Sequence, residues 1–238
     1  MANAPKTFLL VHGAWHGGWC WRRVADLLSA RGHKVFTPTL AGLGASSHLL
    51  NDSIDLDTHV ADIVNFIRWE GVADVVLCGH SYAGMVISGV AERSLPALSS
   101  IVFLDAFVPE DGEAILDLSA AAAREAIMAV LRQGGKTVPP RTAATFNVNE
   151  GDRAWVDSLT VPQPIGTFTQ RIRLTGARER VPRKAYIRAR DYTNPAFDRA
   201  YARLKSDPSW RVFEVPCGHD VMVDMPELLA EILQTASQ

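Results

Sequence analysis

Ser81 stands in a sequence context that can make its hydroxyl group a nucleophile. The segment Gly79–Ala83 follows the apolar run Val75–Cys78 and precedes a stretch of small and apolar residues. A nucleophile elbow is a serine on a sharp turn between a strand and a helix, with small residues two positions before and after it. Gly79 and Ala83 meet that requirement, although alanine replaces the second glycine of the usual Gly-x-Ser-x-Gly pattern. We predict Ser81 as a nucleophile; the alternative is a serine that only caps the next helix.

A general base must accept the proton of this serine, because a hydroxyl group is a poor nucleophile at neutral pH. Among the seven histidines, His219 follows the last apolar strand, Val212–Val215. This position is at the carboxyl end of the sheet, where the turn at Ser81 also opens. His80 adjoins the serine, but a sharp turn points neighbouring side chains apart. We therefore predict His219 as the base, in preference to a surface histidine near the start of a helix.

The glycine-rich loop His12–Gly18 meets a further requirement of acyl transfer, namely backbone N–H groups that stabilise an oxyanion. Such donors usually come from the residue after the nucleophile and from the loop after an early strand. We predict the backbone N–H groups of Ala14 and Tyr82 as this oxyanion hole. The competing interpretation is a dinucleotide cradle, but the glycines of the loop do not fit Gly-x-Gly-x-x-Gly. We expect neither a cofactor nor a metal ion.

Two aspartates are candidates for the carboxylate that orients the histidine. Asp105 follows the apolar run Ile101–Leu104, and a charge in so apolar a stretch is costly unless it has a partner. Asp191 follows the next predicted strand, where a solvated carboxylate paired with arginine is the competing interpretation. Both keep the chain order Ser, Asp, His. The residues favour Asp105, with Asp191 as the alternative.

Short apolar runs alternate with amphipathic stretches along most of the chain. Strands are predicted at residues 8–11, 35–37, 75–78, 101–104, 185–187 and 212–215, and helices at 19–31, 56–70, 85–91, after Asn194, and at 226–235. This alternation predicts a doubly wound, mostly parallel α/β sheet. It breaks where an alanine-rich helical stretch, Leu116–Leu131, precedes several prolines. We interpret residues 109–182 as an inserted helical cap, and residues 1–108 and 183–238 as the core.

The composition is that of a globular protein and excludes several classes of function. Of 238 residues, 47% are hydrophobic and 21% charged, and a net charge of −2 offers no broad positive field for nucleic acid. The arginine-rich stretch Arg171–Arg190 is interpreted as a solvated loop, because acidic residues interleave it. The apolar run Phe8–Val11 is too short for a signal peptide or a membrane span. We expect a cytoplasmic protein without a membrane partner.

The cysteines argue against both a disulfide framework and a structural zinc site. Cys20, Cys78 and Cys217 are odd in number, far apart in the sequence and without Cys-x-x-Cys spacing. We predict that all three are reduced and mainly packed.

Four segments together resemble the α/β-hydrolase superfamily, in its branch of plant methylesterases and hydroxynitrile lyases with bacterial esterase relatives. They are the stretch Val11–Trp21, the serine turn, the stretch Phe103–Pro109, and Gly218–His219. The resemblance covers residues 6–112 and 183–235, without the cap. It implies a cofactor-free serine hydrolase that cleaves small carboxylic esters through an acyl-enzyme, with a substrate pocket under the cap.

The resemblance also bears on the choice of acid. In most hydrolases of this fold the acid follows the strand that corresponds to Ala185–Ile187, which points to Asp191. Some members carry the acid one strand earlier, at the position of Asp105. Both aspartates stay candidates, and Asp105 is preferred.

Two other functions are compatible with this scaffold, a hydroxynitrile lyase and a ligand receptor with little turnover. The lyases that this chain resembles use a hydroxyl residue in the first loop and a lysine directly after the catalytic histidine. Here those positions hold Gly13 and Asp220. Gly13 has no side-chain donor, and Asp220 would repel an anion if it pointed into the site. We therefore predict ester hydrolysis.

The expected partner is a small-molecule ester, and a homodimer is left open. Four large apolar residues of the cap would suit an apolar or aromatic part of a substrate: Met128, Phe146, Trp155 and Phe168. Each of them is interpreted first as core.

Overall fold

A six-stranded sheet forms the centre of the molecule, whose computed structural model describes residues 4–238. In spatial order its strands are β2 (Lys34–Phe36), β1 (Thr7–Val11), β3 (Val75–His80), β4 (Leu98–Leu104), β7 (Lys184–Ala189) and β8 (Trp210–Val215). All pairings between neighbouring strands of this sheet are parallel. The predicted fold class, a doubly wound α/β sheet, is confirmed.

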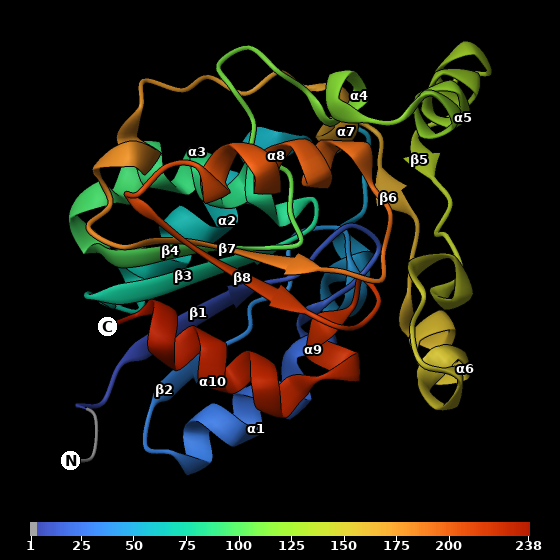
Figure 1. Cartoon of the computed structure of the whole chain (residues 1–238). Helices are drawn as coiled ribbons and strands as arrows, with labels where there is room; N and C mark the ends of the chain where they lie inside the picture. The colour runs from blue at the N-terminus through green and yellow to red at the C-terminus, as the bar shows by residue number, and fades with distance from the viewer. Residues whose placement is uncertain (1–3) are drawn as a thin grey trace.

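Helices cover both faces of the sheet (Figure 1). On one face lie α1 (Arg22–Ala30) and α10 (Pro226–Ala236), and on the other α2 (Leu56–Trp69), α3 (Ala83–Ser94) and α8 (Pro195–Lys205). The start of α2 is a capping box, in which the side chains of Asp55 and Thr58 each accept from the other's backbone N–H. At the start of α8, Asn194 caps the helix and a proline occupies its first turn, as predicted.

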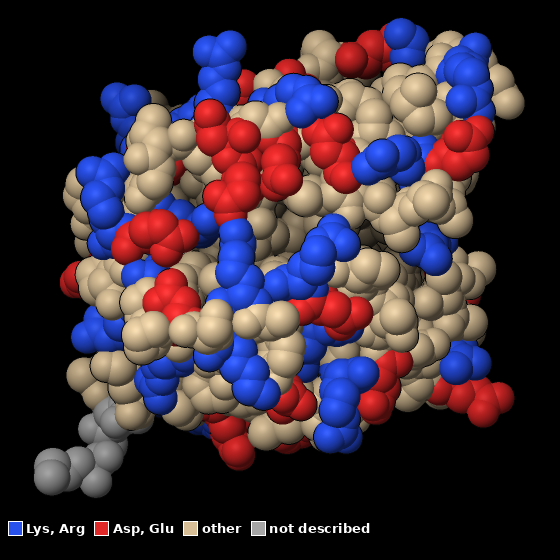
Figure 2. Space-filling model, turned by 45° about the horizontal axis from the view of Figure 1, so that its top comes forward, with Lys and Arg blue, Asp and Glu red and all other residues tan. Residues whose placement is uncertain are grey.

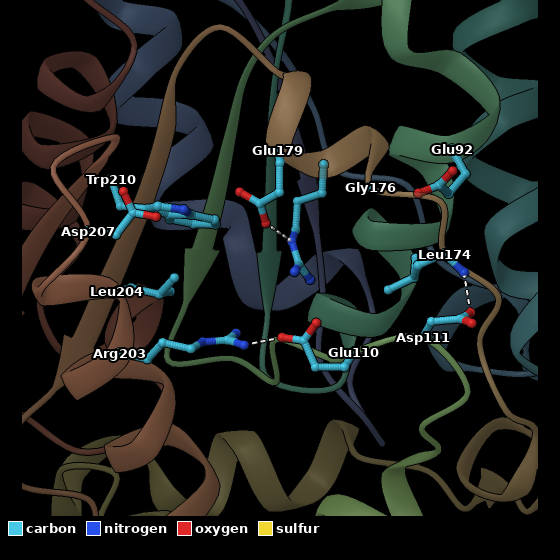
Figure 3. A pocket seen from close by; sticks show the side chains of 11 residues that line it. Glu92, Glu110, Asp111, Leu174, Gly176, Glu179, Arg203, Leu204, Asp207 and Trp210 are labelled. Atoms are coloured by element: carbon cyan, nitrogen blue, oxygen red, sulfur yellow. Dashed lines mark hydrogen bonds and ion pairs between the residues drawn. The ribbon is translucent and has the colours of Figure 1, made fainter.

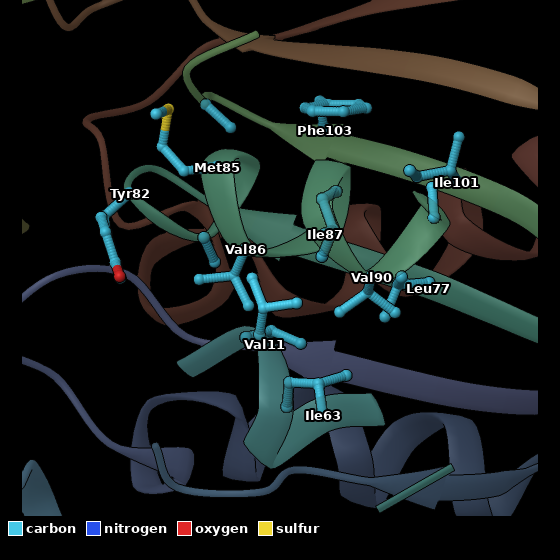
Figure 4. Close-up of a cluster of buried hydrophobic side chains, with 14 of the residues drawn as sticks. Val11, Ile63, Leu77, Tyr82, Met85, Val86, Ile87, Val90, Ile101 and Phe103 are labelled. Atoms are coloured by element: carbon cyan, nitrogen blue, oxygen red, sulfur yellow. The ribbon is translucent and has the colours of Figure 1, made fainter. Parts of the chain in front are cut away.

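The central strands bury apolar side chains on both faces, because successive residues of a strand point to opposite sides. In β1, Val11 belongs to one buried cluster and Leu10 to the other. In β3, Leu77 and Cys78 divide in the same way. Figure 4 shows the first cluster, where side chains of α2 and α3 pack over the sheet and Tyr82 lies at its edge.

Residues 109–182, predicted as the cap, contribute no strand to the six-stranded sheet. They form α4 (Ile115–Leu118), α5 (Ala121–Arg132), β5 (Thr137–Val138), η4 (Ala143–Phe146), α6 (Glu150–Leu159), β6 (Gln163–Pro164), α7 (Gly166–Thr169) and η5 (Ala177–Arg180). In Figure 1, α5, β5 and α6 lie on the side toward which the arrowheads of β7 and β8 point. Trp15 ties this segment to the first loop, because its indole donates to Val138 O and its backbone N–H to Gln163 Oε1.

The single helix predicted at Leu116–Leu131 is wrong, since α4 and α5 are separated by extended backbone at Ser119 and Ala120. Local hydrogen bonds close both ends of α4. The Asp117 carboxylate accepts from Ala114 N, and the Ser119 hydroxyl donates to a carbonyl of α4. The helix predicted from Trp19 likewise starts as a short 3-10 turn, η1 (Gly18–Trp21), before α1.

The remaining short elements are η2 (Gly44–Leu49), η3 (Leu95–Ala97) and α9 (Val221–Asp224). Within the described residues, no helix is both long and apolar enough to cross a membrane. Cys20, Cys78 and Cys217 are buried free thiols, in agreement with the sequence prediction. Figure 2 shows basic and acidic side chains interspersed over one face, apart from one group of acidic side chains.

Candidate active site

Ser81 occupies the sharp turn between β3 and α3, with a left-handed φ of 55°. Glycine is required on each side of this turn, at positions 79 and 84. A Cβ atom at Gly79 would lie 2.7 Å from Ala83 O, and one at Gly84 would lie 1.9 Å from Phe107 O. The tightest packing therefore falls on Gly79 and Gly84, which explains how alanine is accommodated at position 83.

Three side chains form a hydrogen-bonded chain at this turn. His219 Nε2 lies 2.9 Å from Ser81 Oγ, and His219 Nδ1 lies 2.6 Å from Asp105 Oδ2. Because a carboxylate only accepts, Nδ1 carries the proton and Nε2 is free to accept one from the serine. His219 and Asp105 are buried, whereas Ser81 is partly exposed.

The carboxyl ends of neighbouring parallel strands bring these residues together. Ser81 N donates to Leu104 O at the end of β4, and Asp105 N donates to Ile187 O in β7. Asp105 takes a left-handed φ of 40°, which turns its side chain at the end of β4. His219 lies in the loop after β8, where its N–H donates to a carbonyl of η4.

Asp191, the alternative acid, lies away from the histidine. Its side chain is 55% exposed and lies 3.7 Å from Arg190. Its backbone N–H donates to Cys217 O, and its carbonyl accepts from Asn147 Nδ2. Of the two aspartates, the structure brings only Asp105 to His219.

The first loop lies directly against the serine. A Cβ atom at Gly13 would lie 3.0 Å from Ser81 Cβ. His12 fixes the loop, because its ring bonds Gly13 O and accepts from Leu40 N. Burial lowers the pKa of His12 to about 3, so its ring stays neutral. In the described part of the chain, the backbone N–H groups of Ala14 and Tyr82 have no hydrogen-bond acceptor, so both are available to an oxyanion.

A buried ion pair lies behind this loop. His16 Nδ1 lies 2.8 Å from Ala14 O and His16 Nε2 lies 3.1 Å from Asp220 Oδ2. Both nitrogens face acceptors, so the ring is an imidazolium. Burial alone would lower the pKa of His16, but Asp220 raises it above its ordinary value. Burial alone would likewise raise the pKa of Asp220, and His16 lowers it instead.

His80, the neighbour of Ser81 in the sequence, packs against the loop that carries His219. Its Nε2–H donates to His219 O at 3.0 Å, and the rings of His80 and His219 are 4.4 Å apart. Burial lowers the pKa of His80, so the ring is neutral. Neither His80 nor His16 received a role from the sequence. The available signal was a second histidine, His16, in the glycine-rich loop that supplies the predicted N–H donors.

Aromatic rings surround His219. Tyr192 and Phe197 stack on its imidazole, with ring centroids 4.5 and 5.5 Å away, and Phe146 lies 5.3 Å away. Phe146 and Phe168 are buried, as their interpretation as core requires. That interpretation was nevertheless incomplete for Phe146, because tertiary packing places it on the candidate base.

Asp105 is held on its second oxygen as well. Its Oδ1 accepts from Ala189 N at 3.1 Å and from Arg188 Nη1 at 2.5 Å. Arg188 belongs to the arginine-rich stretch interpreted as a solvated loop. For this residue that interpretation is wrong, because it lies in β7 with its side chain 7% exposed.

One group of side chains has the residue types of a metal site. Ligand atoms of His80, His219 and Asp220 lie within 4.8 Å of one another. Both nitrogens of His219 are engaged by Ser81 and Asp105, and one oxygen of Asp220 is engaged by a histidine. The group therefore does not present three free ligands.

Comparison with known proteins places the chain in a family. The Alpha/beta hydrolase family matches residues 8–232. The chain belongs to this family. This membership confirms the resemblance inferred from the four sequence segments.

Two curated relatives and one solved structure extend the comparison. A carbendazim hydrolyzing esterase of Nocardioides sp. (strain SG-4G) is 43% identical over 98% of each chain. Methyl jasmonate esterase 1 of Vitis vinifera is 34% identical over 46% of this chain and 42% of its own. An extracellular α/β-hydrolase from a Paenibacillus species has a TM-score of 0.86 and 24% identity, covering 98% of this chain and 99% of its own. At 24% identity, the similarity to the Paenibacillus hydrolase shows a shared fold.

Proposed function

We propose that this α/β-hydrolase cleaves small carboxylic esters through an acyl-enzyme on Ser81. The observation that carries the proposal is the hydrogen-bonded chain from Ser81 Oγ through His219 to Asp105. The esterase relative that matches over the whole chain supports the same class of reaction. Asp105, rather than Asp191, is the acid in this proposal.

In the first half of the reaction, Ser81 Oγ attacks the carbonyl carbon while its proton passes to His219 Nε2. The carbonyl oxygen becomes an oxyanion, which accepts hydrogen bonds from the backbone N–H groups of Ala14 and Tyr82. The tetrahedral intermediate then expels the alcohol, which takes the proton from His219. The products of this half are the acyl-enzyme, in which the acyl group is esterified to Ser81, and the free alcohol.

In the second half, a water molecule repeats these steps. His219 Nε2 accepts a proton from the water as its oxygen attacks the acyl carbon. The intermediate expels Ser81, which regains its proton, and the carboxylic acid leaves. Asp105 stabilises the imidazolium in both halves without taking its proton.

The surroundings of the site suit an apolar or aromatic group on the substrate. Phe146 lies against His219, and Phe168 lies near both Trp15 and Tyr82, with ring centroids 5.7 and 6.0 Å away. Two relatives are named for carbendazim and methyl jasmonate. We propose both compounds, with short aryl and methyl esters, as the first substrates to test.

The geometry disfavours a hydroxynitrile lyase. A Cβ atom at position 13 would lie 2.8 Å from His80 Nδ1, so the hydroxyl residue that the lyases use does not fit there. The sequence argument from Asp220 needs correction, because its carboxylate bonds His16 and does not act as a free charge at the site. We therefore propose negligible release of cyanide from mandelonitrile.

The proposal is tested by hydrolysis of p-nitrophenyl acetate by the wild type, Ser81→Ala and a matched control, Ser158→Ala, whose serine is exposed. We expect Ser81→Ala to lower kcat/KM by roughly 10⁴-fold or more, since a nucleophile is lost. Ser158→Ala should equal the wild type. An organophosphate should label Ser81, as read by mass spectrometry of peptides. Label on another residue, or cyanide release without esterase activity, would contradict the proposal.

A further inference from the structure

Arg188 is a buried cation on the candidate acid. All five of its N–H groups donate, to Asp105 Oδ1, Ala189 O, Tyr192 O and, twice, to Asp198 Oδ1. Burial would lower the pKa of Arg188, but Asp105 and Asp198 raise it, so the guanidinium keeps its charge. A fork engaged in this way cannot rotate without breaking several hydrogen bonds.

We propose that Arg188 is a positioning residue for the catalytic acid, which directs Asp105 Oδ2 to His219 and offsets the charge of the carboxylate. The inference rests on the proposed function, in which His219 acts as base. With Oδ1 occupied by Arg188 and Ala189 N, the single oxygen left for His219 is Oδ2, at 2.6 Å. A rotation of the carboxylate would break these bonds together.

The charge of Arg188 also acts on His219 through Asp105. Asp105 is the carboxylate in direct contact with His219, and a carboxylate favours the imidazolium. Arg188 opposes that effect from the far side of Asp105. Without Arg188, Asp105 would therefore favour the imidazolium form of His219 more strongly.

The ionisable side chains packed directly against His219 are either uncharged or paired with an opposite charge. Burial keeps His80 neutral, and it raises the pKa of Tyr192, so that phenol is also uncharged. Burial raises the pKa of Cys217 to about 12, so its thiol is uncharged. The charge of Asp220 is matched by His16.

Two groups complete the surroundings of the charged pair. Asp198, beyond Arg188, has a side chain 54% exposed, so water screens it. Burial raises the pKa of Tyr186, which lies in β7 beside Asp105 and Arg188, so its phenol is uncharged. Asp105 and Arg188 are therefore the charged pair on one side of the His219 ring. On another side the exposed Arg141 places its guanidinium 5.6 Å from the ring centroid of Phe146.

The test follows the ring of His219 by NMR, with long-range ¹H–¹⁵N spectra recorded between pH 4.5 and 9. The ring signal is assigned by its loss in His219→Asn. We expect Arg188→Met to raise the titration midpoint of His219 by about one pH unit, because the carboxylate becomes uncompensated. The acidic limb of kcat/KM should move by the same amount, so the loss of activity is larger at pH 6 than at pH 8.

Three further variants sharpen the test. Arg188→Lys keeps the charge and should restore the wild-type midpoint, while kcat stays low because the fork is lost. Asp198→Asn removes a negative charge from the far side of the guanidinium and should lower the midpoint by a few tenths. The matched control is Arg190→Met, whose exposed side chain pairs with Asp191 and should leave the midpoint and kcat unchanged.

An unchanged midpoint in Arg188→Met would overturn the inference. If that variant does not fold, Arg188→Lys decides, because a kcat equal to that of the wild type would show that the fork does not position Asp105 and would overturn the inference. The NMR titration does not depend on turnover. A wild type without esterase activity would therefore refute the proposed function and still leave this measurement decisive.

Discussion

Charged side chains of the same types line two regions of the molecule, the buried edge of the sheet and a pocket on the surface. At the sheet edge, the buried charge cluster consists of His16, Asp105, Arg188 and Asp220. The surface pocket lies between the end of α3, the segment after β4 and α8 (Figure 3). Its lining includes Glu92, Glu110, Asp111, Arg178, Glu179, Arg203 and Asp207.

The two regions differ in how water reaches the charges. Glu110 and Arg203 form an ion pair across the surface pocket, with side chains 58% and 47% exposed. Exposed pairs of this kind contribute about 0–1 kcal/mol, because water screens them. In the buried charge cluster, removal of one partner leaves an uncompensated charge, which costs about 3–5 kcal/mol. Residue type alone therefore does not reveal which charges matter.

The largest expected effect is on kcat, when one of three carboxylates, Asp105, Asp191 or Glu110, is replaced by an amide. Asp105→Asn should lower kcat by roughly 10⁴-fold, because an amide does not hold His219 in the tautomer that accepts the serine proton. Asp191→Asn and Glu110→Gln should stay within about twofold of the wild type, since both side chains are exposed and outside the hydrogen-bonded chain. The measurement is kcat on p-nitrophenyl acetate. A severe loss in Asp191→Asn would show that the wrong acid has been chosen.

The second effect is on the free energy of unfolding, measured for one variant in each of the two regions. Asp220→Asn should lower the free energy of unfolding by about 3 kcal/mol or more, because it leaves His16 buried without its counter-ion. Arg203→Gln, the matched change in the surface pocket, should lower it by about 1 kcal/mol or less. Urea unfolding at pH 7 measures both values. Equal losses in the two variants would remove the distinction between the regions.

The third effect is the dependence of stability on pH, to which buried histidines near the sheet edge contribute. Burial lowers the pKa of His12 to about 3 and that of His59 to about 4. The unfolded chain binds these protons near pH 6.5 and the folded chain does not, so stability falls as pH drops below 6.5. Each histidine contributes up to about 1.4 kcal/mol per pH unit.

His59→Gln sharpens this measurement. His59 donates to Ala41 O and lies 3.0 Å from the hydroxyl of Tyr82, and glutamine can also donate and accept. We expect urea unfolding at pH 6.5, 5.5 and 4.5 to give a shallower slope in this variant than in the wild type. A matched change of the exposed His48 should leave the slope as it is. An unaltered slope in His59→Gln would exclude His59 as a source of the acid sensitivity.

The positions of Ser81 and His219 could be inferred from the sequence because their signals are local. An elbow needs small residues at fixed distances from the serine, and Gly79 lies against Ala83 as that rule requires. The histidine follows the last strand of a regular alternation, so its place at the carboxyl edge follows from the parallel sheet. The alternation of strands and helices is local as well, since it depends on the periodicity of apolar residues.

The partners of the buried charges were decided by the tertiary structure. Asp105 and Asp191 both follow strands, and the apolar run before Asp105 favoured it, but only the structure shows that it takes a left-handed backbone and contacts His219. Arg188 resembles its exposed neighbours in sequence, yet it lies in a strand covered on both faces and meets an aspartate 83 positions away. The sequence by itself determined the fold class, the turn at Ser81 and the place of His219. Only the tertiary structure decided which charged side chains are removed from water and therefore need an oppositely charged partner.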